Sequence, residues 1–140
     1  MADLSVLIRL HKHELDEKRR ALNELYNELA LLEQKRQQLE AEFNREKEAA
    51  SAVDDIHYTF PRYAEKVQKK REELQQAAGI LDIKVEKAKD DLMESFSELK
   101  KYEMTQDERD RLEREEQLIK ENEAFDAIAL EGFRRRKQDE

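Results

Sequence analysis

The chain has 140 residues, of which 44% are charged and 38% hydrophobic, with two glycines, one proline and no cysteine. This composition is typical of long helices and coiled coils, and it excludes a thick globular core, disulfides and thiolate metal sites. The formal net charge of −8, without a clustered basic face, argues against binding to nucleic acid or to an acidic membrane.

A seam of apolar residues runs through roughly the first fifty residues. Apolar side chains recur there at the a and d positions of a heptad without a proline or glycine, which predicts a coiled-coil helix. The a positions include Ile8, Leu15, Leu22, Leu29 and Phe43, and the d positions include Leu4, Leu25, Leu32 and Leu39.

The beginning of this helix is apolar on almost every side and is followed by basic residues. The apolar residues are Leu4, Val6, Leu7 and Ile8, and the basic residues are Arg9, Lys12, Lys18, Arg19 and Arg20. A helix end of this kind requires burial. Two partners stay open for it, the acidic C-terminal part of this chain and another protein.

A turn is predicted over residues 51–60, with the chain folding back at Asp54 and Asp55. Thr59 or Phe60 is expected to cap the second helix. Pro61 then lies in the first helical turn, where its missing amide hydrogen costs no hydrogen bond.

A second seam follows the turn, through Phe60, Val67, Leu74, Leu81, Val85, Leu92, Leu99 and Tyr102. In an antiparallel pair of helices, a positions face d positions, and large residues then face small ones repeatedly. The predicted pairs are Ala50 with Phe60, Phe43 with Val67, Leu32 with Ala78, Leu29 with Leu81, Leu25 with Val85 and Leu22 with Ala88. We therefore predict an all-α fold, a long antiparallel two-helix coiled-coil hairpin with a C-terminal helical extension.

Polar residues interrupt the seams at Lys18, Arg36, Glu46 and Arg71. Because long side chains can reach solvent from a thin interface, we interpret these positions as tolerated or register-fixing layers, with partner binding as the alternative. Gly79 interrupts the second helix at a local cost of about 1 kcal/mol.

The register pairs Met1 with Arg109, which predicts a hairpin over 1–109 and a C-terminal helical extension over 110–140. Thr105 and Glu108 have capping-box spacing, so a kink or a new helix start is one possibility there. Apolar residues continue at helical intervals at Leu112, Leu118, Ile119, Phe125, Ile128, Ala129 and Phe133. The extension can continue as a single helix, fold back onto the hairpin or await another protein, and the sequence leaves all three open.

Acidic and basic residues occupy different parts of the same C-terminal segment. Residues 103–123 are strongly acidic, and Arg134, Arg135, Arg136 and Lys137 follow, where the helix dipole favours cations. Away from the ends, Ile80 and Ile83 fall at outward heptad positions beside Gly79, and Met93 is also expected to be exposed. Scattered apolar surface residues are the ordinary interpretation of such a group, and a docking patch near the middle of the rod is the alternative.

Catalytic and metal-binding patterns are missing from the sequence. The three histidines are His11, His13 and His57, and the first two point to different faces of a helix. The Glu-x-x-His signature of di-iron bundles, phosphate-binding glycine loops and nucleophile motifs do not occur. We predict a non-enzymatic protein without a catalytic site, cofactor or metal.

Several short motifs occur in a specific order along nearly the whole chain. They are Leu7-Ile8-Arg9-Leu10, Asp16-Glu17-Lys18-Arg19-Arg20, Phe60-Pro61-Arg62-Tyr63, Glu98-Leu99-Lys100-Lys101-Tyr102-Glu103, Glu108-Arg109-Asp110-Arg111, and Ile128-Ala129 before the arginine cluster. In this order and spacing the chain resembles the flagellar export protein FliJ family, in its short alphaproteobacterial form.

The resemblance implies a cytoplasmic coiled-coil component of the flagellar type III export apparatus, similar in shape to the central stalk of rotary ATPases. It implies contacts with the hexameric export ATPase ring, with the cytoplasmic domain of the export gate membrane protein and with export chaperones, at the inner membrane but without membrane insertion. Ring contacts are expected from Leu4 to Arg20 and from 103 to 137, and a gate contact from Ile80 and Ile83. The predicted partner-binding residues are Leu4, Leu7, Ile8, Arg9, Lys12, Arg19, Arg20, Ile80, Ile83, Phe125, Phe133, Arg134 and Arg135. A self-associating adaptor coiled coil and the stalk protein of a virulence-type secretion system are the alternatives.

Overall fold

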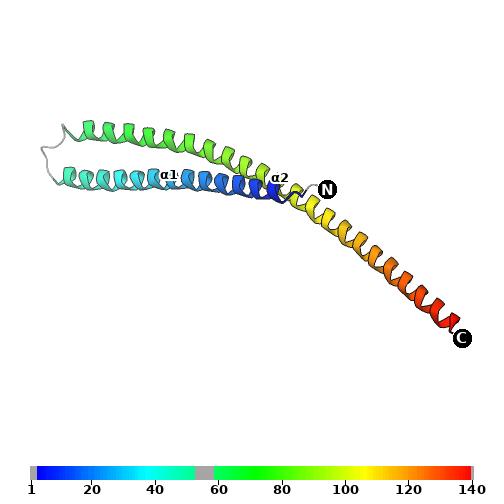
Figure 1. Ribbon diagram of the computed structural model, residues 1–140. Helices are drawn as coiled ribbons and strands as arrows, with labels where there is room; N and C mark the ends of the chain where they lie inside the picture. Colours follow the sequence, from blue (N-terminus) through cyan, green and yellow to red (C-terminus); the bar gives the residue numbers. More distant parts are fainter. Residues whose placement is uncertain (1–2, 53–58, 140) are drawn as a thin grey trace. The chain divides into compact units, whose positions relative to one another are not determined.

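The computed structural model describes residues 3–52 and 59–139. Helix α1 spans Ser5–Ser51 and helix α2 spans Phe60–Gln138, and the described ranges contain no strand (Figure 1). The two helices pack against each other as a helical hairpin, so the predicted all-α fold is confirmed. By internal contacts the chain divides into one unit of His13–Phe96 and another of Met1–Lys12 with Ser97–Glu140. The separate division into 1–109 and 110–140 stays a prediction.

Helix α1 begins with a cap and with a bond to α2. The Asp3 carboxylate accepts a hydrogen bond from the Ser5 amide at 3.1 Å and another from the Ser5 hydroxyl at 2.9 Å. The Leu4 amide donates to Gln106 Oε1 at 3.0 Å, and the Leu4 carbonyl accepts from the Ile8 amide at 2.9 Å. Amides at the start of a helix have no partner within the helix, so these bonds stabilise its first turn.

The helix ends on either side of the connection follow from local bonds. At the end of α1, the Ala52 amide donates to the Ala49 carbonyl at 3.3 Å, which tightens the last turn. At the start of α2, the Thr59 carbonyl accepts from the Tyr63 amide at 3.1 Å, so Pro61 lies in the first turn. The predicted bend at Asp54 and Asp55, and His57, lie outside the described residues.

The unit of residues 13–96 contains most of the buried apolar side chains. Leu15, Leu39, Val67, Leu81 and Val85 are buried, each at a predicted a or d position. Aromatic rings join the two helices at the end of this unit near the connection, because the Phe43 ring stacks on Phe60 at 6.0 Å and on Tyr63 at 6.4 Å between ring centres. In Figure 1 the green part of α2 accordingly lies alongside α1.

The other unit pairs the beginning of α1 with the part of α2 around Leu99, which is buried. The His11 ring stacks on Tyr102 with ring centres 4.7 Å apart, and His11 Nδ1 lies 4.0 Å from the Glu98 carboxylate. Gln106, which bonds Leu4, is the residue that the predicted register places opposite it. The Leu4–Gln106 bond therefore follows the predicted heptad alignment, whereas His11 stacks on Tyr102, three residues beyond Leu99, which that alignment places opposite it.

Each polar residue of the seam is accommodated differently. Lys18 Nζ donates to Oγ of the buried Ser95, and Arg71 donates to Glu40 on the other helix. Arg36 points out of the seam and pairs with Glu33 of its own helix, and Glu46 is exposed. Polar groups in a seam are tolerated where they find partners or water, and these residues satisfy that condition.

Helix α2 continues well beyond the part that pairs with α1. The Thr105 hydroxyl donates to the Lys101 carbonyl at 2.8 Å, so it bonds within the helix instead of capping a new one. The possibility of a fresh helix start at Thr105 is therefore wrong, and α2 is assigned as one helix from Phe60 to Gln138. All residues from 111 to 139 are exposed.

Replacing Gly79 with alanine is expected to stabilise the hairpin by about 0.5–1 kcal/mol. Gly79 lies inside α2 without a positive φ, and a Cβ added there meets no atom within 4 Å. The free energy of unfolding from urea denaturation, followed by circular dichroism, measures the gain. Gly132→Ala is the matched control, because it has equal space but lies within residues 111–139, beyond the part of α2 that pairs with α1. A loss of stability in Gly79→Ala would contradict the prediction.

Candidate functional site

One of the predicted gate-contact residues, Ile80, lies beside a surface hollow between the helices. Ile80 is 57% exposed and Ile83 is 73% exposed, and Met93 is exposed further along α2. Ile80 lines a hollow of about 370 Å³, whose apolar members are Leu31, Leu32, Ala77, Ile80 and Leu81. Leu31 is itself largely exposed and was missed by the sequence analysis, although a leucine at an outward heptad position next to a core leucine is a usable signal.

A second hollow lies between the same helices and measures about 520 Å³. Its apolar lining consists of Leu29, Leu32, Leu74 and Ala78, and its polar lining consists of Glu33, Arg36, Glu40, Arg71 and Gln75. The small side chains of Ala77 and Ala78 explain both hollows, because an alanine opposite a leucine does not fill a coiled-coil layer.

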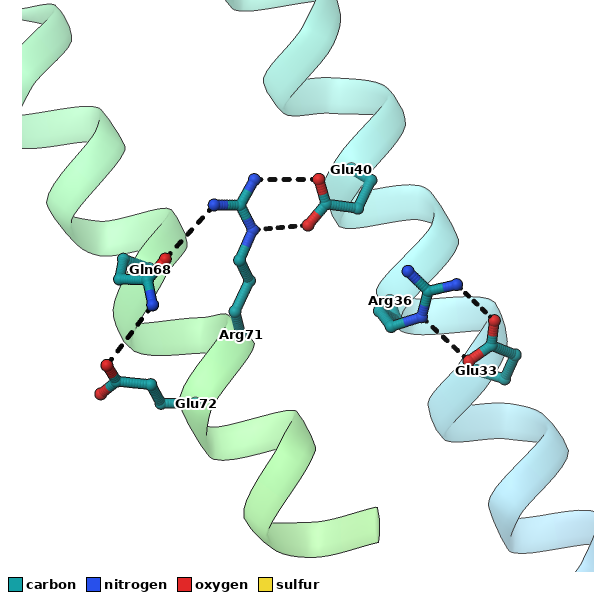
Figure 2. A network of polar contacts seen from close by, with 6 residues as sticks. All are labelled: Glu33, Arg36, Glu40, Gln68, Arg71 and Glu72. Carbon is teal, nitrogen blue, oxygen red and sulfur yellow. Dashed lines mark hydrogen bonds and ion pairs between the residues drawn. The ribbon is translucent and has the colours of Figure 1, made fainter.

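The charged lining residues of this second hollow, Glu33, Arg36, Glu40 and Arg71, form two bidentate pairs (Figure 2). Arg71 Nε and Nη2 donate to the two Glu40 oxygens at 2.5 and 2.9 Å, a bidentate bond from α2 to α1. Arg71 Nη1 donates to Gln68 at 3.3 Å. Arg36 forms a separate bidentate bond with Glu33, at 3.0 and 2.6 Å, on α1 alone.

These bonds shift the acidity of both partners. The hydrogen bond from Arg71 lowers the pKa of Glu40, and the same bond raises the pKa of Arg71. The bond from Arg36 likewise lowers the pKa of Glu33. A bidentate arginine–carboxylate bond favours the charged form of both groups. All four groups therefore stay charged near neutral pH.

Glu40→Gln is expected to reduce the dependence of hairpin stability on acid pH. The folded-state pKa of Glu40 lies below its ordinary value of 4.5, so the Arg71 bond stabilises the fold fully above that value and the stabilisation is lost as pH falls through the lowered pKa. Urea denaturation at a series of acid pH values measures the difference between wild type and variant. Glu46→Gln is the control, because it removes an exposed carboxylate from the same helix. Equal acid profiles for Glu40→Gln and wild type would contradict the prediction.

The predicted residues at the beginning of α1 differ in how far they are exposed to solvent. Leu4 and Ile8 are half-buried on the side that faces α2, whereas Leu7, Arg9 and Lys12 are exposed. Val6 and Leu10 are exposed apolar neighbours. The first turns of α1 are thus partly covered by the part of α2 around Tyr102 and Gln106, and their outer side is available to a partner.

Two further predicted residues, Arg19 and Arg20, are exposed in the unit of residues 13–96. Arg19 Nη1 lies 3.7 Å from the Asp16 carboxylate three residues earlier. An exposed pair of this kind contributes little to stability, so the guanidinium can exchange its partner at low cost.

The predicted residues of the C-terminal part all lie on the exposed end of α2. Phe125 is 73% exposed and Phe133 is 64% exposed, and their eight-residue separation puts them on neighbouring positions of one helix face. Arg134 is exposed, and Arg135 Nε lies 3.8 Å from Glu131 on the same helix. The partner-binding role of these residues, and of the others, stays a prediction.

Two findings concern chemistry and the membrane. Within residues 3–52 and 59–139, no three or more histidine, aspartate or glutamate side chains are grouped so that they could hold a metal ion. Over the same ranges, neither helix contains a stretch that is long and apolar enough to span a lipid bilayer.

The heptad seam and the paired helices define a coiled-coil protein. Residues 1–138 match the family model described as flagellar FliJ protein, and the chain belongs to this family. The resemblance seen in the sequence is thereby confirmed. The family is structural and non-catalytic, and membership makes the chain a component of the flagellar export apparatus. Comparison with curated proteins and with solved structures returned no match.

Proposed function

We propose that the chain is a non-enzymatic stalk and coupling component of the flagellar type III protein export apparatus. It binds the hexameric export ATPase ring and the cytoplasmic domain of the export gate membrane protein, and it handles export chaperones. It works in the cytoplasm, held at the inner membrane through the apparatus, without entering the bilayer. The observation that carries this proposal is the family match over 1–138, and its flagellar description favours this role over a virulence-type secretion system.

The form of the chain supports a mechanical role. Two helices in contact resist bending more than one, and the described ion pairs run largely along single helices, as in Arg111 with Glu108 and Glu115. Exposed pairs of this kind bind partners weakly and exchange rapidly. A stalk that meets successive subunits of a ring needs such contacts, because a tight bond to one subunit would stop its movement.

The exposed end of α2 supplies the ring contact in this proposal, together with the beginning of α1. Phe125 and Phe133 present apolar surface without a covering element in the described structure, and Arg134 and Arg135 add positive charge. Ile80 and Ile83 supply the gate contact.

The proposal is tested by adding the purified chain to the purified flagellar export ATPase and measuring ring assembly and ATP turnover. We expect both to rise with wild type and with Ile83→Glu, and the rise to be lost in Phe125→Glu with Phe133→Glu. All three substitutions place a charge on an exposed apolar position, so a general effect of charge would appear in all variants. No association of wild type with the ATPase by sedimentation would reject the stalk function.

The gate contact is tested separately. Binding of the chain to the purified cytoplasmic domain of the gate protein should weaken in Ile80→Glu with Ile83→Glu and persist in Phe125→Glu. The opposite pattern would move the gate contact to the end of α2.

A further inference from the structure

A face of seven exposed apolar residues, interrupted by Glu115, Asn122 and Asp126, lies uncovered on the last part of α2. Its residues are Leu112, Leu118, Ile119, Phe125, Ile128, Leu130 and Phe133, and each is 46–73% exposed. At about 100° per residue they occupy roughly half of the helix circumference. A helix with a wide apolar face and a polar remainder is stable when that face packs against another element.

Helix α1 does not cover this face. The Leu4 amide bonds Gln106, so the start of α1 lies beside that residue of α2. Every residue from 111 to 139 is exposed, and α2 is assigned as helix through Gln138. The face is therefore available to a separate molecule.

The charges around the face are separated along the helix. Residues 103–123 contain nine acidic and four basic side chains, whereas residues 134–137 are all basic. Among the described residues, Arg134, Arg136 and Lys137 have no ion-pair partner, and Arg135 has only the 3.8 Å contact with Glu131. The segment thus carries a negative part, an apolar middle and a positive end.

We propose that residues 110–138 pair with the same segment of a second copy of this chain in antiparallel orientation. The arrangement brings the basic end of each copy beside the acidic part of the other, and a parallel pair would instead place like charges together. With Leu118 opposite Ala129 of the second copy, Leu112 lies opposite Arg135, two residues from Phe133, and Glu113 lies opposite Arg134. The paired apolar part, residues 112–133, is about 33 Å long.

This pairing goes beyond the proposed function and does not depend on it. The two are linked by competition, because the same apolar face cannot pair with a second copy and contact the ATPase ring at once. Self-paired chains would then be a reserve form that dissociates when the ring is available. The pairing is measured without the ATPase, so its failure leaves the stalk function untouched.

The test measures association of the full chain by sedimentation equilibrium at several protein concentrations. Wild type is expected to form dimers. Two triple variants test the charges. The acidic-end variant carries Arg134→Glu, Arg135→Glu and Arg136→Glu, and the basic-part variant carries Asp110→Lys, Glu113→Lys and Glu116→Lys. Each variant is expected to associate at least about tenfold more weakly than wild type, since it carries one sign of charge at both ends of the segment. An equimolar mixture of the two variants is expected to regain dimers.

The outcomes are decisive in both directions. Monomeric wild type, or full self-association of the acidic-end variant, overturns the proposal, and so does a mixture that stays monomeric. Leu118→Glu should also abolish the dimer, and Ile83→Glu, an equally exposed apolar position outside the segment, should leave it intact. Thermal unfolding of each variant verifies that the hairpin is folded.

The relative orientation of the two paired segments is measured by cysteine cross-linking, which is specific because the chain has no cysteine of its own. Leu112→Cys and Phe133→Cys chains are mixed and oxidised. Antiparallel pairing predicts cross-links between unlike variants, and cross-links formed mainly between two Leu112→Cys chains would overturn the orientation.

Discussion

Leu81→Ala is expected to lower the free energy of unfolding of the hairpin by about 2–4 kcal/mol. Leu81 is 8% exposed at a d position of the seam. Removing three carbon atoms from a buried leucine loses apolar burial and leaves a space that neighbouring helices fill only in part. Urea denaturation followed by circular dichroism gives the difference from wild type.

The neighbouring residue provides a matched control for this substitution. Ile80 precedes Leu81 on the same helix, has the same number of carbon atoms and is 57% exposed. Ile80→Ala is expected to change the free energy of unfolding by about 0.5 kcal/mol or less. If the two substitutions had equal effects, Leu81 would not belong to a packed seam, and the antiparallel register would be wrong.

Ending the chain after Arg109 is expected to remove the stimulation of the export ATPase and to leave the hairpin folded. All residues from 111 to 139 are exposed, so their removal takes away little apolar burial, and the free energy of unfolding should change by about 1 kcal/mol or less. ATP turnover with the purified ATPase and urea denaturation of the shortened chain measure the two parts.

The shortened chain also tests the predicted division at residue 110. A hairpin that no longer unfolds cooperatively would mean that 110–140 stabilises the rest of the chain. Full ATPase stimulation by the shortened chain would instead move the ring contact to the beginning of α1, where Leu7, Arg9 and Lys12 are exposed.

The seam was predictable because a coiled coil uses a regular repeat. Val67, Leu81 and Val85 are buried as the heptads require, and Phe43 contacts residues on both sides of Val67 across the seam. A single antiparallel register brings the apolar positions of both helices together, so the heptad pattern and the helix packing agree.

The candidate surfaces were less predictable, because exposure depends on what the opposite helix leaves uncovered. Leu31 was missed since its neighbour Leu32 fills the d position, and the hollow beside it is lined on α2 by the small side chain of Ala77 together with Ile80 and Leu81. The path of residues 110–138 was also open in the sequence. An apolar stripe indicates that burial is needed and does not specify which molecule provides it.

Charge neutralisation within each helix has a consequence for how the protein meets its surroundings. Glu40 pairs with Arg71 across the two helices, whereas the pairs of Arg36 with Glu33, Lys89 with Glu86 and Arg111 with Glu108 each run along one helix. Short local dipoles cancel within a few ångströms, so they project only a weak field into the solvent. The free energy of unfolding of the hairpin should therefore change little with ionic strength. Association of two chains through the separated charges of residues 103–137 should instead weaken as ionic strength rises.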